Sequence, residues 1–158
     1  MTIISSILIY IALCDIIYII MSRLYHTNIA RALPNVRQKW LYYVLQFTWG
    51  LNMNIVGGIV ALCLLICGRR PVRYGWNYCF ELNINWGMEL GIFFVAPKNA
   101  SEYLKNHEHG HGIQNIYLGP FSIGVVSIPS AIRFWFRELM TKIGHAPTTD
   151  YDDIWFEG

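Results

Sequence analysis

The chain has 158 residues, of which 54% are hydrophobic and only 14% are charged. The formal net charge is +2, and no basic stripe interleaved with stacking aromatics is present, which argues against a nucleic-acid partner. Soluble domains are closer to a quarter charged, whereas long stretches here carry no charge at all. The composition therefore predicts one integral membrane domain rather than a soluble globular domain.

The first apolar segment covers residues 3–22 and contains no Lys or Arg. Its length is close to the ~20 residues that a helix needs to cross the hydrocarbon core. A cleaved signal peptide is the alternative, but no basic residue precedes the run and no clear cleavage site of small residues follows it. We therefore expect a retained membrane helix, followed by a polar loop at 22–39 with four basic residues.

The second apolar segment covers residues 40–67 and begins with aromatic side chains of the kind that favour a membrane interface. Glycines and asparagines within the segment would let it pack closely against other helices in lipid. Three arginines follow it, namely Arg69, Arg70 and Arg73. These features predict a second membrane helix over 40–67.

Residues 74–95 have a different period, because apolar side chains alternate with small or polar ones from Tyr74 to Ile92. Period-two alternation is typical of a β-strand with one apolar face. One unbroken strand over this stretch would reach about 60 Å, so a hairpin is favoured. We predict a β-hairpin at about 74–95 that turns between residues 83 and 87, with its apolar face on the helices or in the bilayer surface.

A helix is predicted over residues 100–118, because the Asn-Ala-Ser-Glu sequence at 99–102 has the spacing of a capping box with asparagine as N-cap. A Gly-Pro pair at 119–120 marks the end of this helix. Residues 120–137 begin with a further uncharged segment that is long enough to enter the membrane, with a kink expected at Pro129. Together the segments predict a membrane α-helical bundle of about three to four membrane helices, with the β-hairpin next to the metal-binding helix described below.

That helix contains the sequence His107-Glu108-His109-Gly110-His111, which matches the pattern H-E-x-x-H. Residues four apart lie one turn above each other on one face of a helix, so His107 and His111 can bind one metal ion between their imidazoles. Glu108 is rotated about 100° from His107, which places its carboxylate beside the position where water would bind. Zn²⁺ lowers the pKa of water towards neutrality, and a neighbouring glutamate can take the proton. The pattern predicts a zinc site in which His107 and His111 are ligands and Glu108 is the catalytic base.

His109 points away from the face of His107 and His111 if the segment is helical, which favours a supporting or surface role. An extended segment would instead place all three histidines on one side and bind a metal differently. Gly110 and Gly112 weaken a helix by up to ~1 kcal/mol each, but the cap and the apolar spacing favour the helix. A histidine-rich polar turn that binds metal adventitiously is the remaining alternative.

The five-residue motif resembles the signature of the zincin metallopeptidases. The glycine before its last histidine, on a hydrophobic helix, is similar to the site-2 type intramembrane proteases. The longer run to Asn115, followed by Leu-Gly-Pro at 118–120, resembles small bacterial membrane proteins. The resemblance implies a zinc-dependent peptidase in which His107 and His111 are ligands and Glu108 is the general base. The site-2 type proteases also take an aspartate ligand from a Leu-Asp-Gly motif, which this sequence lacks.

A third metal ligand has to come from elsewhere in the chain. Glutamate-type zincins take a glutamate from a later helix, and Glu157, which follows the aromatic pair Trp155-Phe156, fits that role best. A simple solvated acidic turn is the alternative for this tail. The other candidate ligands are Asp153, Asp152, Asp150, His145 and Glu138.

The hairpin indicates how a substrate could bind, because the edge of a strand offers N–H and C=O groups to an extended peptide. A peptide has to be extended for its scissile bond to reach the metal site. We therefore predict substrate binding by Asn85, Trp86, Gly87 and Met88, near the expected turn. A purely structural hairpin that caps the bundle is the alternative.

Three functions follow from these expectations. The leading one is a multi-pass zinc endopeptidase of a bacterial cell membrane, with the lipid bilayer and a protein or peptide substrate as its partners. The second is a zinc-dependent membrane hydrolase of a non-peptide, lipid-like substrate. The third is a metal-binding membrane protein without catalytic activity.

Overall fold

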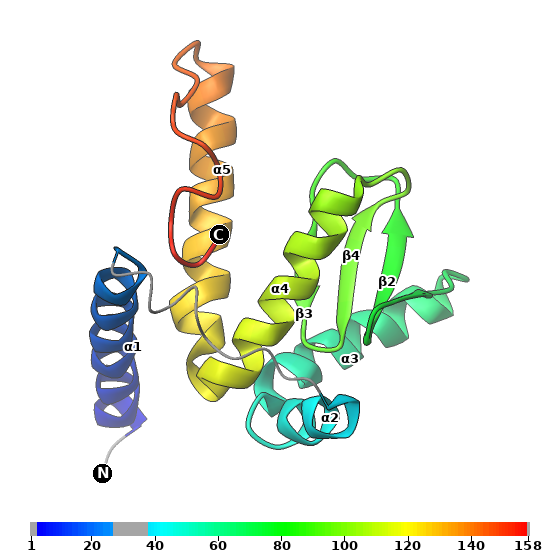
Figure 1. Cartoon of the computed structure of the whole chain (residues 1–158), viewed down its shortest axis with the longest axis horizontal. Helices are drawn as coiled ribbons and strands as arrows, with labels where there is room; N and C mark the ends of the chain where they lie inside the picture. The colour runs from blue at the N-terminus through cyan, green and yellow to red at the C-terminus, as the bar shows by residue number, and fades with distance from the viewer. Residues whose placement is uncertain (1–2, 27–37, 158) are drawn as a thin grey trace. The chain divides into compact units, whose positions relative to one another are not determined.

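The computed structural model describes residues 3–26 and 38–157. Most of the basic loop predicted at 22–39 therefore lies outside the described residues. The described chain forms two compact units, one with residues 3–26 and 123–157 and the other with residues 38–122 (Figure 1).

The first unit contains two long helices and a short turn that directly precedes the second of them. These elements are α1 (Ile3–His26), the π-helical turn η3 (Ile123–Ser127) and α5 (Ile128–Lys142). The turn η3 contacts both helices. A Cβ atom added to Gly124 would lie 2.7 Å from the sulfur of Cys14, so this glycine allows η3 and α1 to approach closely.

Both helices of this unit differ in their bounds from the segments predicted at 3–22 and 120–137. Helix α1 extends to His26, and α5 is displaced towards the C-terminus, ending at Lys142. The kink expected at Pro129 stays a prediction. This proline lies in the first turn of α5, directly after the π-helical turn η3.

The segment after α5 folds back along that helix (Figure 1). Two arginines of α5, Arg133 and Arg137, donate hydrogen bonds to backbone carbonyls of this tail at 3.1 and 2.8 Å. Tyr18 of α1 packs against the rings of Trp155 and Phe156, with 5.7 and 6.0 Å between ring centroids. The tail, which carries the predicted third ligand, is therefore held by both helices of its unit.

In the second unit, the segment predicted as one helix over 40–67 forms two helices. These are α2 (Lys39–Phe47) and α3 (Leu51–Ile66), whose axes differ by 89°. The prediction of one continuous membrane helix here is therefore wrong. Gly50 lies at the break, where an added Cβ would be 2.6 Å from the side-chain amide nitrogen of Asn115, so the bend depends on the absence of a side chain at this position.

Helix α4 (Glu102–Leu118) carries the histidine motif and corresponds to the helix predicted at 100–118. Its N-cap is Ser101, whose hydroxyl accepts a hydrogen bond from the backbone N–H three residues further on, at 3.2 Å. The predicted cap at Asn99 is therefore wrong by two positions. A hydrogen bond of 3.0 Å closes the turn at 97–100 and keeps Asn99 outside the helix. A short 3₁₀ turn, η2 (Gly119–Phe121), follows α4.

Four strands form one sheet in the order β1-β2-β4-β3, in which β2 and β4 are parallel and the other neighbours are antiparallel. The prediction of one hairpin over 74–95 is therefore wrong. The alternation belongs to two hairpins that turn at the positive-φ glycines Gly75 and Gly91, and residues 83–87 cross between them. The strands are β1 (Val72–Tyr74), β2 (Asn77–Leu82), β3 (Met88–Leu90) and β4 (Phe93–Pro97).

The two faces of the sheet contact different helices. On the face with Phe80 and Val95, α3 lies close enough that a Cβ atom added to Gly57 would overlap the sheet backbone at Leu90. The opposite face meets α4, where the Lys105 ammonium lies 2.8 Å from the carboxylate of Glu81. The alternating sequence therefore fits a sheet whose apolar face packs on α3 and whose more polar face packs on the metal-binding helix.

Among the described helices, α1 is the one that is long and apolar enough to cross a membrane by itself. The pair of α2 and α3 and the pair of α4 and α5 satisfy the same criterion only if each bent pair counts as a single span. The described part of the chain thus has one candidate span, or up to three by length and composition. A multi-pass arrangement stays a prediction.

Candidate metal centre

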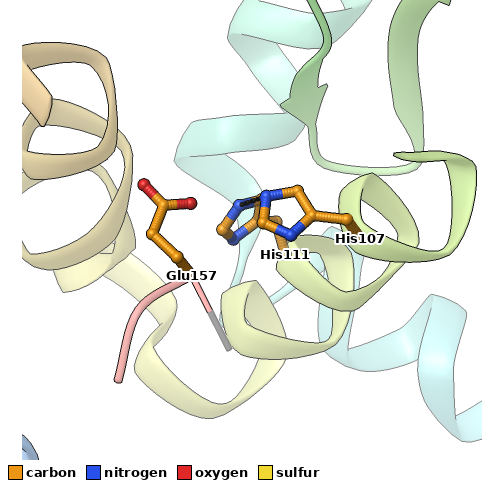
Figure 2. A group of neighbouring side chains, drawn as sticks. All are labelled: His107, His111 and Glu157. Atoms are coloured by element: carbon orange, nitrogen blue, oxygen red, sulfur yellow. Dashed lines mark hydrogen bonds between the residues drawn. The ribbon is translucent and has the colours of Figure 1, made fainter. Parts of the chain in front are cut away.

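His107 and His111 lie one turn apart on α4, with their rings close together (Figure 2). Their Nε2 atoms are 3.1 Å apart, and the ring centroids are separated by 4.6 Å with an angle of 83° between the ring planes. The helix predicted across the motif is present. The alternative of an extended segment with three histidines on one side is therefore excluded.

The separation of the two nitrogens fits a shared metal ion. A Zn–N bond is about 2.0–2.1 Å long, so two imidazoles at a tetrahedral angle would place their nitrogens about 3.3 Å apart. The observed 3.1 Å is close to that spacing, and small ring rotations would cover the difference. Imidazole is also a preferred ligand type for Zn²⁺, so both the spacing and the donor chemistry suit this ion.

Gln114 sets the orientation of His111. The Gln114 side-chain oxygen lies 2.8 Å from Nδ1 of His111. In the tautomer that donates this hydrogen bond, Nε2 keeps its lone pair for a metal. A partner on the second nitrogen fixes the ring of a ligand histidine and raises its basicity. Gln114 lies three residues after His111 on the same helix face, which is a spacing that a sequence could reveal.

Glu108 is buried, with 4% of its surface exposed. Its carboxyl group lies beside Gly87, the residue that precedes β3. A Cβ atom added to Gly87 would be 2.8 Å from the carboxyl carbon of Glu108 and closer still to one of its oxygens. The predicted catalytic base can occupy its position because residue 87 has no side chain.

A second buried carboxyl group lies in the same region. Glu89 of β3 accepts a hydrogen bond from the backbone N–H of Gly91. Desolvation by burial raises the pKa of Glu89 to about 8, with opposing contributions from His111, which lowers it, and Glu108, which raises it. Burial thus favours the protonated, neutral form of the Glu89 carboxyl group. No local spacing connects Glu89 with the motif, so the sequence offered no signal for it.

A network of buried polar side chains holds α4 in place. Gln46 of α2 donates to the backbone carbonyl of Gly112 at 2.8 Å, and its side-chain oxygen accepts from Asn115 at 2.7 Å. Asn54 of α3 donates to the same oxygen at 2.7 Å and accepts from a backbone N–H of the β3–β4 turn at 2.8 Å. Because Gly112 directly follows His111, the network connects the metal-binding turn to both α2 and the sheet.

His109 lies apart from the metal-binding pair. Its ring packs at the β1–β2 turn, where a Cβ atom added to Gly75 would be 3.0 Å from Nε2 of His109. The two glycines of the motif region differ in their surroundings. A Cβ atom at Gly110 would meet no atom within 4 Å, whereas one at Gly112 would be 2.8 Å from the side-chain nitrogen of Asn77. Gly112 therefore permits close packing, and Gly110 does not serve that purpose.

His107 and His111 are possible metal ligands that one unit of the described chain brings together (Figure 2). The histidines belong to the second unit and Glu157 to the first. Glu157 is 3% exposed, and its backbone N–H donates to the carbonyl of Ile154 at 3.0 Å. The other predicted ligand candidates do not join this group, namely Glu138, His145, Asp150, Asp152 and Asp153.

The predicted substrate-binding residues lie at the start of β3. Gly87 is the position that meets Glu108, and Met88 begins the strand. Asn85 and Trp86 lie in the connection that precedes it. Strand β3 is at the edge of the sheet, paired on one side with β4. The structure thus brings an edge strand next to the predicted base.

In comparisons with known proteins, the chain matches no family model, no curated protein and no solved structure.

Proposed function

We propose that this chain is a membrane zinc endopeptidase that hydrolyses a peptide bond near the bilayer. The observation that carries the proposal is the pair of imidazoles on one helix turn, with 3.1 Å between the Nε2 atoms of His107 and His111. Zinc bound by this pair would act as a Lewis acid that polarises a carbonyl group, and it would lower the pKa of water. Glu157 is the proposed third ligand, because two histidines and a glutamate are a known ligand set of catalytic zinc.

Glu108 is the proposed general base. Its carboxylate accepts a proton from water as the water oxygen bonds to the carbonyl carbon of the substrate, and it returns that proton to the leaving nitrogen as the C–N bond breaks. Burial of Glu108 keeps the carboxylate out of bulk solvent. Gln114 supports the same reaction indirectly, because it orients His111 through the 2.8 Å contact.

The position of β3 favours a peptide over a lipid-like substrate. An extended peptide can add to an edge strand through backbone hydrogen bonds, whereas a lipid needs no strand edge. The carbonyl of Leu90 is covered by α3 at Gly57. A substrate peptide would therefore form backbone hydrogen bonds only with the Met88 end of β3, which is the end next to Glu108.

Metal content tests the first part of this proposal. The wild-type protein, purified in detergent, is expected to retain zinc, and the double variant His107→Ala/His111→Ala is expected to lose it. The variant Glu108→Gln should keep the metal, since Glu108 is not a proposed ligand. Equal zinc content in wild type and double variant would rule out a zinc site on α4.

Hydrolysis tests the second part. A quenched-fluorescent peptide library and a short-chain ester lipid are offered in the same detergent to wild type and to Glu108→Gln. We expect cleavage of peptides by wild type and a loss of about 100-fold or more in the variant, as is typical for removal of a general base. Unchanged activity in Glu108→Gln would show that Glu108 is not the base, and release from the ester lipid alone would favour the lipid-like substrate.

The third ligand is tested by comparing two carboxyl-to-amide changes in the same tail. Glu157→Gln is expected to weaken zinc binding by about tenfold or more, because an amide is a poorer ligand than a carboxylate. Asp153→Asn is the matched control, since Asp153 is exposed and lies outside the ligand group. Equal zinc affinity in the two variants would contradict the role of Glu157.

A further inference from the structure

The second unit contains an open hollow of about 520 Å³ at the C-terminal end of α3. Its size is within the range of small-molecule sites in proteins. The hollow lies apart from the histidine motif along the sequence and is lined from three elements, which are the end of α3, the sheet and the turn before α4. The lining residues are Gly68, Arg69, Arg70, Val72, Glu81, Lys98 and Asn99.

Three of the lining side chains are cations, and the backbone that carries them is fixed. Helix α3 ends in a Schellman motif, with hydrogen bonds from Gly68 N–H to Leu65 and from Arg69 N–H to Leu64, at 3.0 and 2.9 Å. Gly68 has the positive φ of 76° that this motif requires. On the opposite side, the backbone N–H of Lys98 bonds to the sheet at 3.0 Å. Two anchored turns thus present positive charge to one hollow.

The one carboxylate among the lining residues, Glu81, is already paired. It lies 2.8 Å from the ammonium of Lys105 on α4, which is outside the lining. This ion pair leaves the positive charge of Arg69, Arg70 and Lys98 to face the hollow. Among the described residues, no hydrogen bond or ion pair engages these three side chains, which suits a site for an anion.

The surface next to the hollow is apolar. One face of α3 packs on the sheet, and the other exposes a stripe of large side chains at the helical spacing 55, 59, 62 and 66. The stripe carries no charge and ends at Ile66, which is 77% exposed and lies three positions before Arg69. An apolar stripe that ends in arginines matches the two parts of a phospholipid, whose acyl chains meet apolar surface and whose phosphate meets cations.

We propose that this hollow binds the phosphate group of an anionic phospholipid, whose acyl chains lie along the exposed stripe of α3. The site is separate from the zinc centre and shares with the proposed function only the membrane location. Bound lipid would fix the depth of α3, and with it the depth of the sheet that packs on α3.

The test uses the full-length protein in detergent and three soluble probes, which are dihexanoyl phosphatidylglycerol, dihexanoyl phosphatidylcholine and inorganic phosphate. We expect the phosphatidylglycerol to bind at least about tenfold more tightly than either of the others. Equal binding of the phosphatidylcholine would overturn an anion site. Binding of inorganic phosphate as tight as that of phosphatidylglycerol would overturn the lipid and identify a site for phosphate itself.

Variants locate the site. The triple change Arg69→Gln/Arg70→Gln/Lys98→Gln is expected to weaken phosphatidylglycerol binding at least about tenfold. The matched control removes the same charge from exposed positions outside the hollow, as Arg23→Gln/Lys39→Gln/Lys142→Gln, and should bind like wild type. An equal loss in both triple variants, or none in either, would overturn the proposal.

A gain of binding keeps the test informative if the first triple variant folds poorly. Glu81→Gln removes the one carboxylate from the lining and is expected to tighten the binding of phosphatidylglycerol. Lys105→Met instead leaves the carboxylate of Glu81 without its ion-pair partner and should weaken the binding of phosphatidylglycerol. Weaker binding of phosphatidylglycerol by Glu81→Gln than by Lys105→Met would contradict the proposed role of charge in the hollow. Zinc content and peptide cleavage of the same preparations are expected to stay unchanged, so failure of the lipid site and failure of the zinc peptidase are told apart.

Discussion

At the scale of single residues, the position of Glu108 depends on the space that Gly87 leaves for its carboxyl group. A methyl group at residue 87 would overlap this carboxyl group. We expect Gly87→Ala to lower hydrolysis by about 10- to 100-fold, because small displacements of a catalytic group have effects of that size. Zinc content should stay near that of wild type, since the three atoms nearest to the new methyl group all belong to Glu108, which is not a proposed ligand.

Gly110→Ala is the control for this change, on the motif itself. An added Cβ there meets no atom within 4 Å, and alanine favours a helix over glycine by up to ~1 kcal/mol. This variant should therefore retain activity and unfold at an equal or higher temperature. Comparable loss of activity in both variants would show that the effect of Gly87→Ala does not arise from contact with Glu108.

The buried carboxyl of Glu89 predicts how stability depends on pH. Burial raises its pKa from 4.5 to about 8 in the folded chain, so the folded state binds more protons than the unfolded state between these values. The free energy of unfolding should then fall as pH rises through this interval and level off above it. Denaturant unfolding of the chelator-treated protein at several pH values measures this dependence.

Glu89→Gln is expected to flatten that pH profile, because glutamine keeps an acceptor for the Gly91 N–H and cannot titrate. The variant should equal or exceed wild type in stability at pH 8 and above. A profile as steep as that of wild type would assign the pH dependence to other groups.

At the scale of elements, α4 is positioned by polar contacts as much as by apolar packing. The side chain of Gln46 connects α2 to α3 and α4. Gln46→Leu would leave several buried polar groups without partners, each at a cost of about 1–3 kcal/mol. We expect a loss of about 3 kcal/mol or more in the free energy of unfolding, measured by denaturant titration in detergent.

Thr48→Val provides the comparison for Gln46→Leu in the same region. Thr48 follows α2, is exposed and bonds only locally to the carbonyl of Val44 at 2.6 Å. Its replacement should change stability by less than about 0.5 kcal/mol. If both variants lost equal stability, the network would not be a specific anchor of α4.

Sequence patterns predicted the type of each element better than they predicted how the elements pair and bend. Period-two alternation correctly predicted strands within 74–95, yet it fits one hairpin and two hairpins equally well. The turns at Gly75 and Gly91 and the parallel pairing of β2 with β4 depend on contacts between distant residues. The apolar period over 40–67 likewise does not reveal a bend, because both helices made from it are apolar.

At the scale of the whole molecule, the exposed face of α3 predicts contact with lipid. Cys63 is exposed and lies on this face, between Ile59 and Ile66. With the other three cysteines replaced by alanine, Cys63 in permeabilised membranes should resist a water-soluble maleimide until the protein is denatured. A cysteine introduced at Thr148, in the exposed tail, should react at once.

Rapid labelling of both positions in native membranes would contradict a lipid-covered α3. The next membrane span to test would then be α1, because among the described helices it is the one that is long and apolar enough to cross a membrane by itself. Labelling of Cys63 that appears only after denaturation would support placement of the second unit in the membrane.

The sequence by itself determined the local features of this protein, because they depend on residues a few positions apart. The helix at the motif, the pairing of His107 with His111 and the apolar character of α1 follow from helical spacing and composition. The tertiary structure decided what distant segments place together. It brought Gly87 against Glu108, buried Glu89 near the motif, and assembled three cations around one hollow. Such juxtapositions depend on how chain segments pack, and spacing along one segment does not encode them.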